Sequence, residues 1–356
     1  MKTLTIVGAR PQFVKAAMLS RALVDQGIDG MLCHTGQHSD DNMSGIFLRE
    51  LGLPQPVINL GIHGGGHGQQ TGRMLEALER ALLELAPDRV LVVGDTNSTL
   101  AGALAAAKLG IPVDHVEAGL RSFDRHMPEE INRVVADHIC DRLFAPTVVA
   151  VANLKVEGVP DQRIHRVGDV MVDCLEAFRP IFARQRGLVR ELGLADQDYG
   201  VVTVHRAANT DCAENLNIIA RQLARSPIPV IWPLHPRTRA ALTAAGIGSL
   251  GGQVHVIEPL GYLEMMSLVL EAAAVVTDSG GLQKEACLMG VPCVILRTET
   301  EWQELVDGGW ARLAPVESGL DLWACVEAAR TARPAGRPVD YGDGHAAERI
   351  ARILAG

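Results

Sequence analysis

The sequence predicts an α/β protein made of two doubly wound, Rossmann-like domains. The chain has 356 residues, of which 47% are apolar, so it can bury more than one core. Aromatic residues make up only 4%, and short runs rich in Val, Ile and Leu alternate with amphipathic stretches, as buried parallel strands alternate with helices. The alternation breaks once near the middle of the chain, which indicates two halves of similar architecture.

Strand and helix patterns alternate through the first half. Apolar runs predict strands at 4–7, 31–34, 89–93, 113–116, 143–145 and 164–167. Amphipathic stretches predict helices at 14–26, 43–51, 71–85 and 99–109, one that opens near Glu129, and one after 145. This succession of βα units is enough for one doubly wound domain.

A charged stretch at 178–198 interrupts the alternation, which then begins again. The second half has apolar runs, each followed by a helical pattern, that predict strands at 200–204, 230–233, 254–257, 275–277 and 293–296. The halves share an architecture without sharing sequence. We therefore expect a second domain to follow this stretch.

Charge and cysteine content exclude several classes of function. A net charge of −9 and a pI near 5.7 argue against a nucleic-acid-binding surface, which must be basic. The seven cysteines are odd in number and include no C-x-x-C pair, so we expect reduced thiols in a cytoplasmic protein. No apolar run reaches 18 residues and the start lacks the apolar core of a signal peptide, so we expect no membrane span.

Seven predicted strands are followed directly by charged or hydrogen-bonding residues. In parallel sheets ligands bind beyond the carboxyl ends of the strands, where loops and helix N-termini converge. Any one such residue could be polar only because strand ends meet water, but seven together favour a ligand cleft between the two domains. These residues are Arg10, Asp95, Glu117, His205 with Arg206, His235, the run Asp278 to Gly281, and Arg297.

The segment 277–285, TDSGGLQKE, is the most informative motif. Ser279, Gly280 and Gly281 stand between a strand and a helix, where backbone N–H groups and the helix dipole favour an anion such as a diphosphate. Glu285, one turn further along, is placed to accept hydrogen bonds from paired hydroxyls such as those of a ribose. The alternative is a helix N-cap by Ser279 with a tight turn.

Several histidines and aromatic residues have simpler interpretations. His63 and His67 are four residues apart, but the surrounding glycines disfavour a helix and therefore a metal site. His115 lies inside an apolar strand and is interpreted as a core residue with satisfied hydrogen bonds. Tyr262 and Trp302 are interpreted as packing or rim residues.

Eight motifs, in this order, resemble those of the non-hydrolysing UDP-N-acetylglucosamine 2-epimerases: GARPQFVK, TGQH, GDTNSTLAG, HVEAGLRS, MPEEINR, VTVHR, PLHPRTR and TDSGGLQKEA. The resemblance covers nearly the whole chain. It implies two domains of the glycosyltransferase-B type, at 1–170 and 171–342, with an interdomain cleft and a C-terminal helix at about 343–356 that returns to the first domain. It also implies a homodimer that binds a UDP-sugar and needs no metal or nicotinamide cofactor.

The resemblance also implies a reaction and a set of site residues. The family inverts sugar C2 by eliminating UDP to give a bound glycal and then adding UDP back, which calls for acid/base groups on both faces of the ring. The implied catalytic residues are Asp95, Glu117, Glu129 and His205, although Glu129 or Glu130 could instead cap a helix after Pro128. The implied substrate-binding residues are Arg10, Lys15, Arg206, His235, Met265, Ser279, Gly280, Gly281, Glu285 and Arg297.

Some motifs depart from the usual family pattern. GARPQFVK, VHRAAN and RTETEWQE stand where GTRPEAIK, GHRRE and RDTTERPE are common, and they resemble the branch that acts on UDP-2,3-diacetamido-2,3-dideoxyglucuronate. The substrate alternatives are therefore UDP-N-acetylglucosamine and that uronate, with a glycosyltransferase of the same architecture as a third interpretation. Gln37, His38 and Gln70 match an allosteric UDP-sugar site, but Gln69 replaces the arginine expected beside them.

Overall fold

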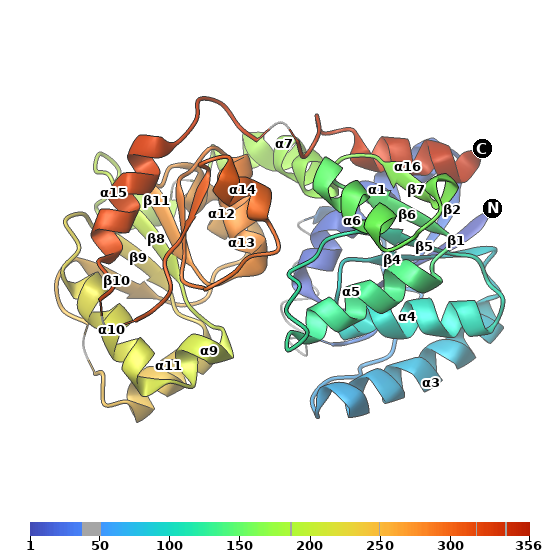
Figure 1. The fold of residues 1–356 in the computed structure, drawn as a ribbon, viewed down its shortest axis with the longest axis horizontal. Helices are drawn as coiled ribbons and strands as arrows, with labels where there is room; N and C mark the ends of the chain where they lie inside the picture. The colour runs from blue at the N-terminus through green and yellow to red at the C-terminus, as the bar shows by residue number, and fades with distance from the viewer. Residues whose placement is uncertain (38–50, 186, 249, 318, 339) are drawn as a thin grey trace. The chain divides into compact units, whose positions relative to one another are not determined.

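The computed structural model describes residues 1–37, 51–185, 187–248, 250–317, 319–338 and 340–356. Contacts divide the chain into two compact units, Met1–Ala177 with Val339–Gly356, and Phe178–Pro338. Each unit is a parallel sheet with helices packed against it (Figure 1). The described residues contain no helix that is both long and apolar enough to cross a membrane.

The first unit is built on a seven-stranded sheet in the order β3-β2-β1-β4-β5-β6-β7. All neighbouring strands pair in parallel, and each strand predicted in this half is present. The two-residue β3 was not predicted because it is too short to carry a pattern. The strands are β1 (Lys2–Val7), β2 (Asp29–His34), β3 (Ile58–Asn59), β4 (Arg89–Val93), β5 (Val113–Val116), β6 (Arg142–Ala145) and β7 (Ile164–Arg166).

The helices of the first unit follow its strands. They are α1 (Arg10–Asp25), α3 (His67–Leu85), α4 (Asn97–Lys108), α5 (Pro128–Ile139), α6 (Val148–Val156), the 3-10 turn η1 (Asp161–Arg163), most of α7 (Val170–Phe182), and the C-terminal α16 (Ala346–Ala355). The helix expected at 43–51 lies outside the described residues except for Leu51.

The C-terminal helix α16 packs beside α1 (Figure 1). Its N-terminus is held by Asp173, whose carboxylate accepts N–H bonds from Ala346 at 3.2 Å and Ala347 at 2.8 Å. Burial raises the pKa of Asp173 to about 6, although these backbone bonds oppose the shift. The first turns of α7 are also anchored here, because Cys174 Sγ donates to the carbonyl of Val14 at 3.0 Å. By contacts, the start of α7 and the segment that leads to α16 group with the first unit, and the domain limits at 170 and 342 stay predictions.

The second unit has a six-stranded parallel sheet in the order β10-β9-β8-β11-β12-β13. Its strands are β8 (Gly200–Thr203), β9 (Val230–Pro233), β10 (Val254–Ile257), β11 (Ala274–Thr277), β12 (Cys293–Ile295) and the unpredicted three-residue β13 (Ala311–Leu313). Its helices are α8 (Gly187–Glu191), α9 (Ala207–Thr210), α10 (Ala213–Ala224), α11 (Pro236–Ala244), α12 (Tyr262–Leu270), α13 (Gly280–Leu288), α14 (Gln303–Asp307) and α15 (Leu322–Ala332).

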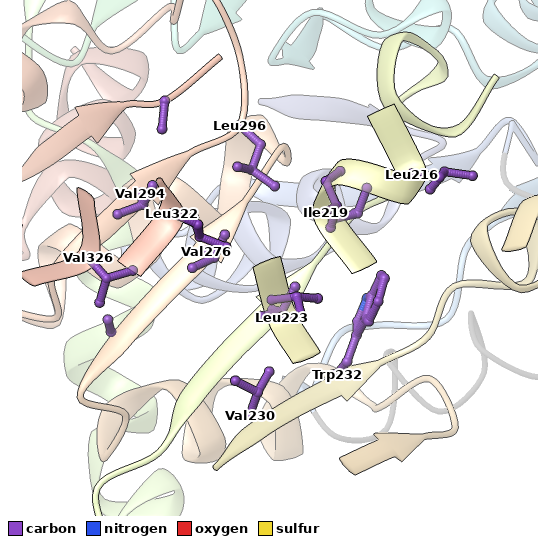
Figure 2. Close-up of a cluster of buried hydrophobic side chains, with 14 of the residues drawn as sticks. Leu216, Ile219, Leu223, Val230, Trp232, Val276, Val294, Leu296, Leu322 and Val326 are labelled. Atoms are coloured by element: carbon purple, nitrogen blue, oxygen red, sulfur yellow. The ribbon is translucent and has the colours of Figure 1, made fainter. Parts of the chain in front are cut away.

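A buried cluster of apolar side chains packs the helices of the second unit onto its sheet (Figure 2). Trp232 and Val276 rise from the strands, and Ile219 and Leu223 of α10 pack over them. Each fully buried side chain of this size contributes roughly 1.5–3 kcal/mol to folding. This packing therefore holds in place the strand ends from which the loops of the site begin.

Candidate active site

Both sheets reverse their strand order beside their first strand. In the first unit β1 lies between β2 and β4, and in the second β8 lies between β9 and β11. Connections leave such a pair of strands in opposite directions, which opens a crevice at the carboxyl edge. The residues predicted for the site follow these central strands and their neighbours.

Gln12 ties together the loops that follow β1 and β4. Its buried carboxamide oxygen accepts the N–H groups of Gly8 at 2.7 Å and Ala9 at 2.9 Å, and its Nε2 donates to the carbonyl of Val93 at 2.6 Å. Gln12 lies in the motif GARPQFVK, and no role was predicted for its side chain. It fixes the spacing between the backbone near Arg10 and the backbone that leads to Asp95.

Asp95 follows β4 and keeps 31% of its side chain exposed. Its Oδ2 lies 2.5 Å from Nη2 of Arg133, and Asn132 Nδ2 donates to its backbone carbonyl at 2.9 Å. Both partners come from α5, so that helix fixes the position of the carboxylate. Neither partner was predicted.

Glu117 follows β5 and is the second acid at this edge. β4 and β5 are neighbours, and Gly94 N–H donates to the carbonyl of Val116 at 2.9 Å, which brings the loops bearing Asp95 and Glu117 together. Glu117 has φ of +73°, a strained value for a residue with a side chain. Its side chain is 9% exposed and pairs with the ammonium of Lys15.

Glu129 and Glu130 both lie in the first turn of α5 but have different surroundings. The half-buried carboxylate of Glu129 forms no hydrogen bond or ion pair within the described part of the chain. Glu130 is buried and accepts from Ser122 N–H at 2.9 Å, Phe123 N–H at 3.0 Å and Arg133 Nη1 at 3.0 Å. Glu130 thus lies in the first turn of α5, where the helix dipole favours an acid, and its carboxylate also binds the preceding loop.

His115 is fully buried, as predicted for a core residue. It links the loop after β4 to α5 through two hydrogen bonds. Its Nδ1 lies 2.7 Å from Oδ1 of Asp137, and its Nε2 lies 2.7 Å from the carbonyl of Gly94. Burial alone would raise the pKa of Asp137, but the charges and hydrogen bonds of His115 and Arg121 outweigh it and hold the pKa below its usual value. The network fixes the backbone on both sides of Glu117, because Asp137 also accepts from Gly119 N–H at 3.0 Å.

Asp278 organises the site of the second unit from a fully buried position after β11. Its carboxylate accepts the backbone N–H groups of His205 at 3.0 Å and Arg206 at 3.0 Å, and Nδ2 of Asn209 at 3.0 Å. These bonds join the loops after β8 and β11, which are adjacent strands. Asp278 belongs to the motif predicted to bind an anion, and its carboxylate binds the neighbouring loop.

His205 and His235 lie side by side, with ring centroids 5.8 Å apart. The pKa of His205 is below its usual value, first because burial disfavours the imidazolium and then because His235, Arg206 and Arg237 repel a further positive charge. The charge of Asp278 opposes this shift. His205 therefore has a neutral imidazole at neutral pH, ready to take up a proton when an anion binds.

Ser279, Gly280 and Gly281 form the N-terminus of α13, and Ser279 Oγ accepts weakly from Leu282 N–H at 3.5 Å. The N-cap alternative is thus present, and it leaves the glycine N–H groups at the start of the helix. A methyl group at Gly281 would have no neighbour within 4 Å, whereas one at Gly280 would clash with Oε1 of Glu301.

The remaining predicted binding residues surround α13. Arg297 pairs with Glu301 at 2.9 Å, Glu285 is buried within α13, and Met265 is buried in α12. Trp302 Nε1 donates to the carbonyl of Gly280 at 3.0 Å, and the Lys284 ammonium lies 4.1 Å from the Trp302 ring centroid. Trp302 is therefore a packing residue beneath the anion motif, as interpreted from the sequence.

The residues predicted for allostery gather at the N-terminus of α4. Gln37 Oε1 accepts Ser98 N–H at 3.0 Å, and Gln70 Oε1 accepts from Asn97 Nδ2 at 2.8 Å. His38 lies outside the described residues, and only the backbone of Arg10 is described, at the start of α1.

The histidine pair of the glycine-rich segment is split by the start of a helix. α3 begins at His67, with Gly66 as its N-cap, and the glycine-rich residues before it are not helical, so the two histidines do not share a helix, as expected. His63 lies before the helix, and its carbonyl accepts from Arg73 at 2.9 Å. Within the described ranges no three His, Cys, Asp or Glu side chains are grouped as metal ligands.

Comparison with known proteins identifies the family. The family model for UDP-N-acetylglucosamine 2-epimerase matches residues 21–355. The chain belongs to the UDP-N-acetylglucosamine 2-epimerase family. It is 49% identical, over 100% of its length and 99% of the relative, to the UDP-2,3-diacetamido-2,3-dideoxy-D-glucuronate 2-epimerase of Pseudomonas aeruginosa.

Other members of the UDP-N-acetylglucosamine 2-epimerase family are also similar. The UDP-N-acetylglucosamine 2-epimerase of Methanocaldococcus jannaschii is 43% identical, with 99% of both chains covered. A crystal structure of the M. jannaschii enzyme with UDP-GlcNAc and UDP matches with a TM-score of 0.89 over 99% of both chains, at 41% identity. The Neisseria meningitidis enzyme bound to UDP-GlcNAc matches with a TM-score of 0.89 at 28% identity, over 99% of both chains.

Membership confirms the predicted fold class, two Rossmann-like parallel α/β units of the glycosyltransferase-B kind. It also confirms that the chain is an isomerase of the UDP-sugar epimerase class. The structure brings the predicted acids of the first unit to one sheet edge, and the predicted histidines and glycines of the second unit to the corresponding edge of the other sheet. The roles of the individual residues stay predictions.

Proposed function

We propose that this protein interconverts UDP-N-acetylglucosamine and UDP-N-acetylmannosamine by 2-epimerisation without net hydrolysis. The observation that carries the proposal is the placement of Asp95, Glu117 and Glu129 at one sheet edge. The first two carboxylates are positioned by Arg133 and Lys15, and Glu129 lies on the helix that carries Arg133. Two acid/base groups are needed to exchange a proton on opposite faces of a sugar ring.

The proposed reaction divides the work between the two units. A carboxylate of the first unit removes the C2 proton as the C1–O bond breaks, and UDP departs with the bonding electrons to leave a 2-acetamidoglucal. UDP then adds back at C1 while a second acid delivers a proton to the other face of C2. Because the C2 proton is weakly acidic, stabilisation of the departing diphosphate must carry much of the barrier reduction.

Residues of the second unit, together with Arg10, are the proposed UDP ligands. The N–H groups at Gly280 and Gly281 and the side chains of His205, His235 and Arg206 suit the diphosphate, and Glu285 suits the ribose hydroxyls. His205 is also a proposed catalytic group, because it can gain a proton as negative charge develops on the leaving group.

The alternative substrate is UDP-2,3-diacetamido-2,3-dideoxyglucuronate, which would react by the same mechanism. The name of the P. aeruginosa relative supports this alternative, and the names of the M. jannaschii and N. meningitidis proteins support the first. Incubating the protein with each UDP-sugar in deuterated water shows which one is the substrate, because turnover incorporates deuterium at C2 of the sugar. Failure of both substrates to exchange would contradict the proposed reaction.

We also propose a cytoplasmic homodimer that requires no metal or nicotinamide. Seven thiols without a disulfide among them suit a reducing compartment. Light scattering of the purified protein tests the dimer, and turnover after dialysis against a chelator tests independence from metal. The match of Gln37 and Gln70 to an allosteric site is tested by adding UDP-N-acetylglucosamine to assays of the uronate.

A further inference from the structure

Phe123 is an exposed aromatic residue in a strained backbone conformation. It lies in the connection between β5 and α5, midway between Glu117 and Glu129, with φ of +59° and 74% of its surface exposed. Among the described residues it is the one aromatic side chain that ranks as exposed. Exposure gains nothing from the hydrophobic effect, and a positive φ costs free energy for any residue with a side chain.

The strain coincides with the proposed catalytic loop. In the described part of the chain only Ala86, Glu117 and Phe123 combine a side chain with a positive φ. Two of the three fall in this single connection, and one of those two is a proposed catalytic acid. Strained backbone persists where the surroundings enforce it and is concentrated at ligand sites.

The surroundings enforce the conformation of Phe123 through Glu130. The buried Glu130 carboxylate accepts the N–H groups of Ser122 at 2.9 Å and Phe123 at 3.0 Å, and the Ser122 hydroxyl at 3.0 Å. Before these residues, Arg121 is pinned by Glu157, whose two oxygens each lie 2.6 Å from its guanidinium. The loop is thus held on both sides, and the phenyl ring is the part left exposed.

The same contacts relate Phe123 to the acids. Glu130 also accepts from Arg133 at 3.0 Å, and Arg133 binds Asp95 at 2.5 Å. A single chain of hydrogen bonds therefore sets the backbone of Phe123 and the carboxylate of Asp95. The loop that carries Phe123 therefore follows β5 at the sheet edge at which C2 is proposed to react.

We propose that Phe123 contacts the pyranosyl group of the UDP-sugar through the apolar C–H face of the ring. This inference rests on the proposed function. An aromatic face suits the weakly positive C–H surface of a sugar and orients it without competing for its hydroxyls. Phe123 therefore acts on the sugar and leaves recognition of UDP to other residues.

The test compares Phe123→Gly and Phe123→Ala with the wild-type enzyme. Glycine relieves the backbone strain, so the unfolding midpoint of Phe123→Gly should rise by about 2–4 °C, while kcat/KM for the UDP-sugar falls about tenfold or more in both variants. The dissociation constant of UDP should stay within twofold of the wild-type value. Ala86→Gly is the matched control for strain, and Val156→Ala, at an exposed apolar residue of α6, is the control for lost surface. Both should keep wild-type kcat/KM.

Three results would overturn the inference. They are kcat/KM of Phe123→Gly within twofold of wild type, a loss of UDP affinity that matches the loss of kcat/KM, or a changed oligomeric state by light scattering, which would assign the ring to a protein interface. Wild-type exchange at C2 is measured first, so failure of the proposed reaction is seen independently of any Phe123 variant.

Discussion

Arg133 binds Asp95 with Nη2 and Oδ2 2.5 Å apart, and its guanidinium is almost completely buried. The other arm of the same fork reaches Glu130 at 3.0 Å. One rigid cation therefore fixes a proposed catalytic carboxylate and the carboxylate that shapes the Phe123 loop. A planar guanidinium can do this because its donors point in fixed directions.

Replacing Arg133 with Lys should lower kcat by tenfold to a hundredfold, because an ammonium cannot hold both carboxylates in place. Arg133→Met should also lose about 3–5 kcal/mol of stability, since two acids would share a buried site without a cation. Steady-state kinetics and urea unfolding measure the two effects. Arg80→Lys on the exposed face of α3 is the control and should match wild type. Wild-type kcat in Arg133→Lys would refute the positioning role.

Ligand binding should take up protons at His205. Its lowered pKa leaves the free side chain neutral near pH 7, and a bound diphosphate should raise that pKa. Because the bound pKa is then the higher one, affinity is greatest below the free pKa and declines as pH rises through the bound pKa. Calorimetry of UDP-N-acetylglucosamine binding to Glu117→Gln, in buffers of different ionisation enthalpy, measures the uptake. The diphosphate of UDP-N-acetylglucosamine is esterified at both ends and does not titrate near pH 7, so the measured protons are not taken up by the ligand.

The matched comparison for proton uptake is a second substitution in the Glu117→Gln background. His205→Asn should abolish the uptake, whereas His235→Asn should retain most of it. Equal uptake with and without His205 would assign the proton to another group.

Asp278→Ala should destabilise the protein by about 3 kcal/mol. The substitution leaves the N–H groups of His205 and Arg206 without their charged acceptor. A buried donor without an acceptor lowers the stability of the folded state. UDP affinity should fall at least tenfold as the loop after β8 loosens. Asp211→Ala, which removes an exposed partner of Arg237, should leave the unfolding midpoint unchanged. Normal UDP binding by Asp278→Ala would show that the loop keeps its shape without this carboxylate.

Gly94→Ala should reduce both stability and turnover. Gly94 has φ of +66°, and an added methyl group would lie 3.4 Å from Oε2 of Glu117 and 3.9 Å from the Lys15 ammonium. The backbone strain should cost about 1–2 kcal/mol. Because both neighbours are at ordinary contact distance, kcat should fall mainly through the backbone shift that relieves this strain, since Gly94 directly precedes Asp95. Gly110→Ala is the matched control, because Gly110 has φ of +71° and no neighbour within 4 Å. It should lose similar stability at full kcat, and equal kcat losses in both variants would point to a global effect.

Sequence patterns predicted the strands and the residues that follow them, but they did not predict the residues that hold the site together. Asp95, Glu117 and His205 were singled out as candidates because strand ends are marked locally by a change from apolar to polar residues. Gln12, Arg133 and the loop-binding role of Glu130 were missed because each acts on residues of another element. The hydrogen bond between Gln12 and Val93 joins residues 81 positions apart, so no periodic pattern in the sequence indicates it. The short β3 and β13 were missed for want of length.

The return of α16 to the first unit sets the order in which the protein can be completed during translation. Residues Phe178–Pro338 emerge from the ribosome before α16 and contain a whole sheet with its own core. The helix α1, in contrast, is covered only once α16 has been made, because α16 packs against α1 and buries Ile350 and Leu354. Synthesis therefore completes the second unit before α16 can cover α1, so the contact that completes the first unit forms after the second sheet has been made.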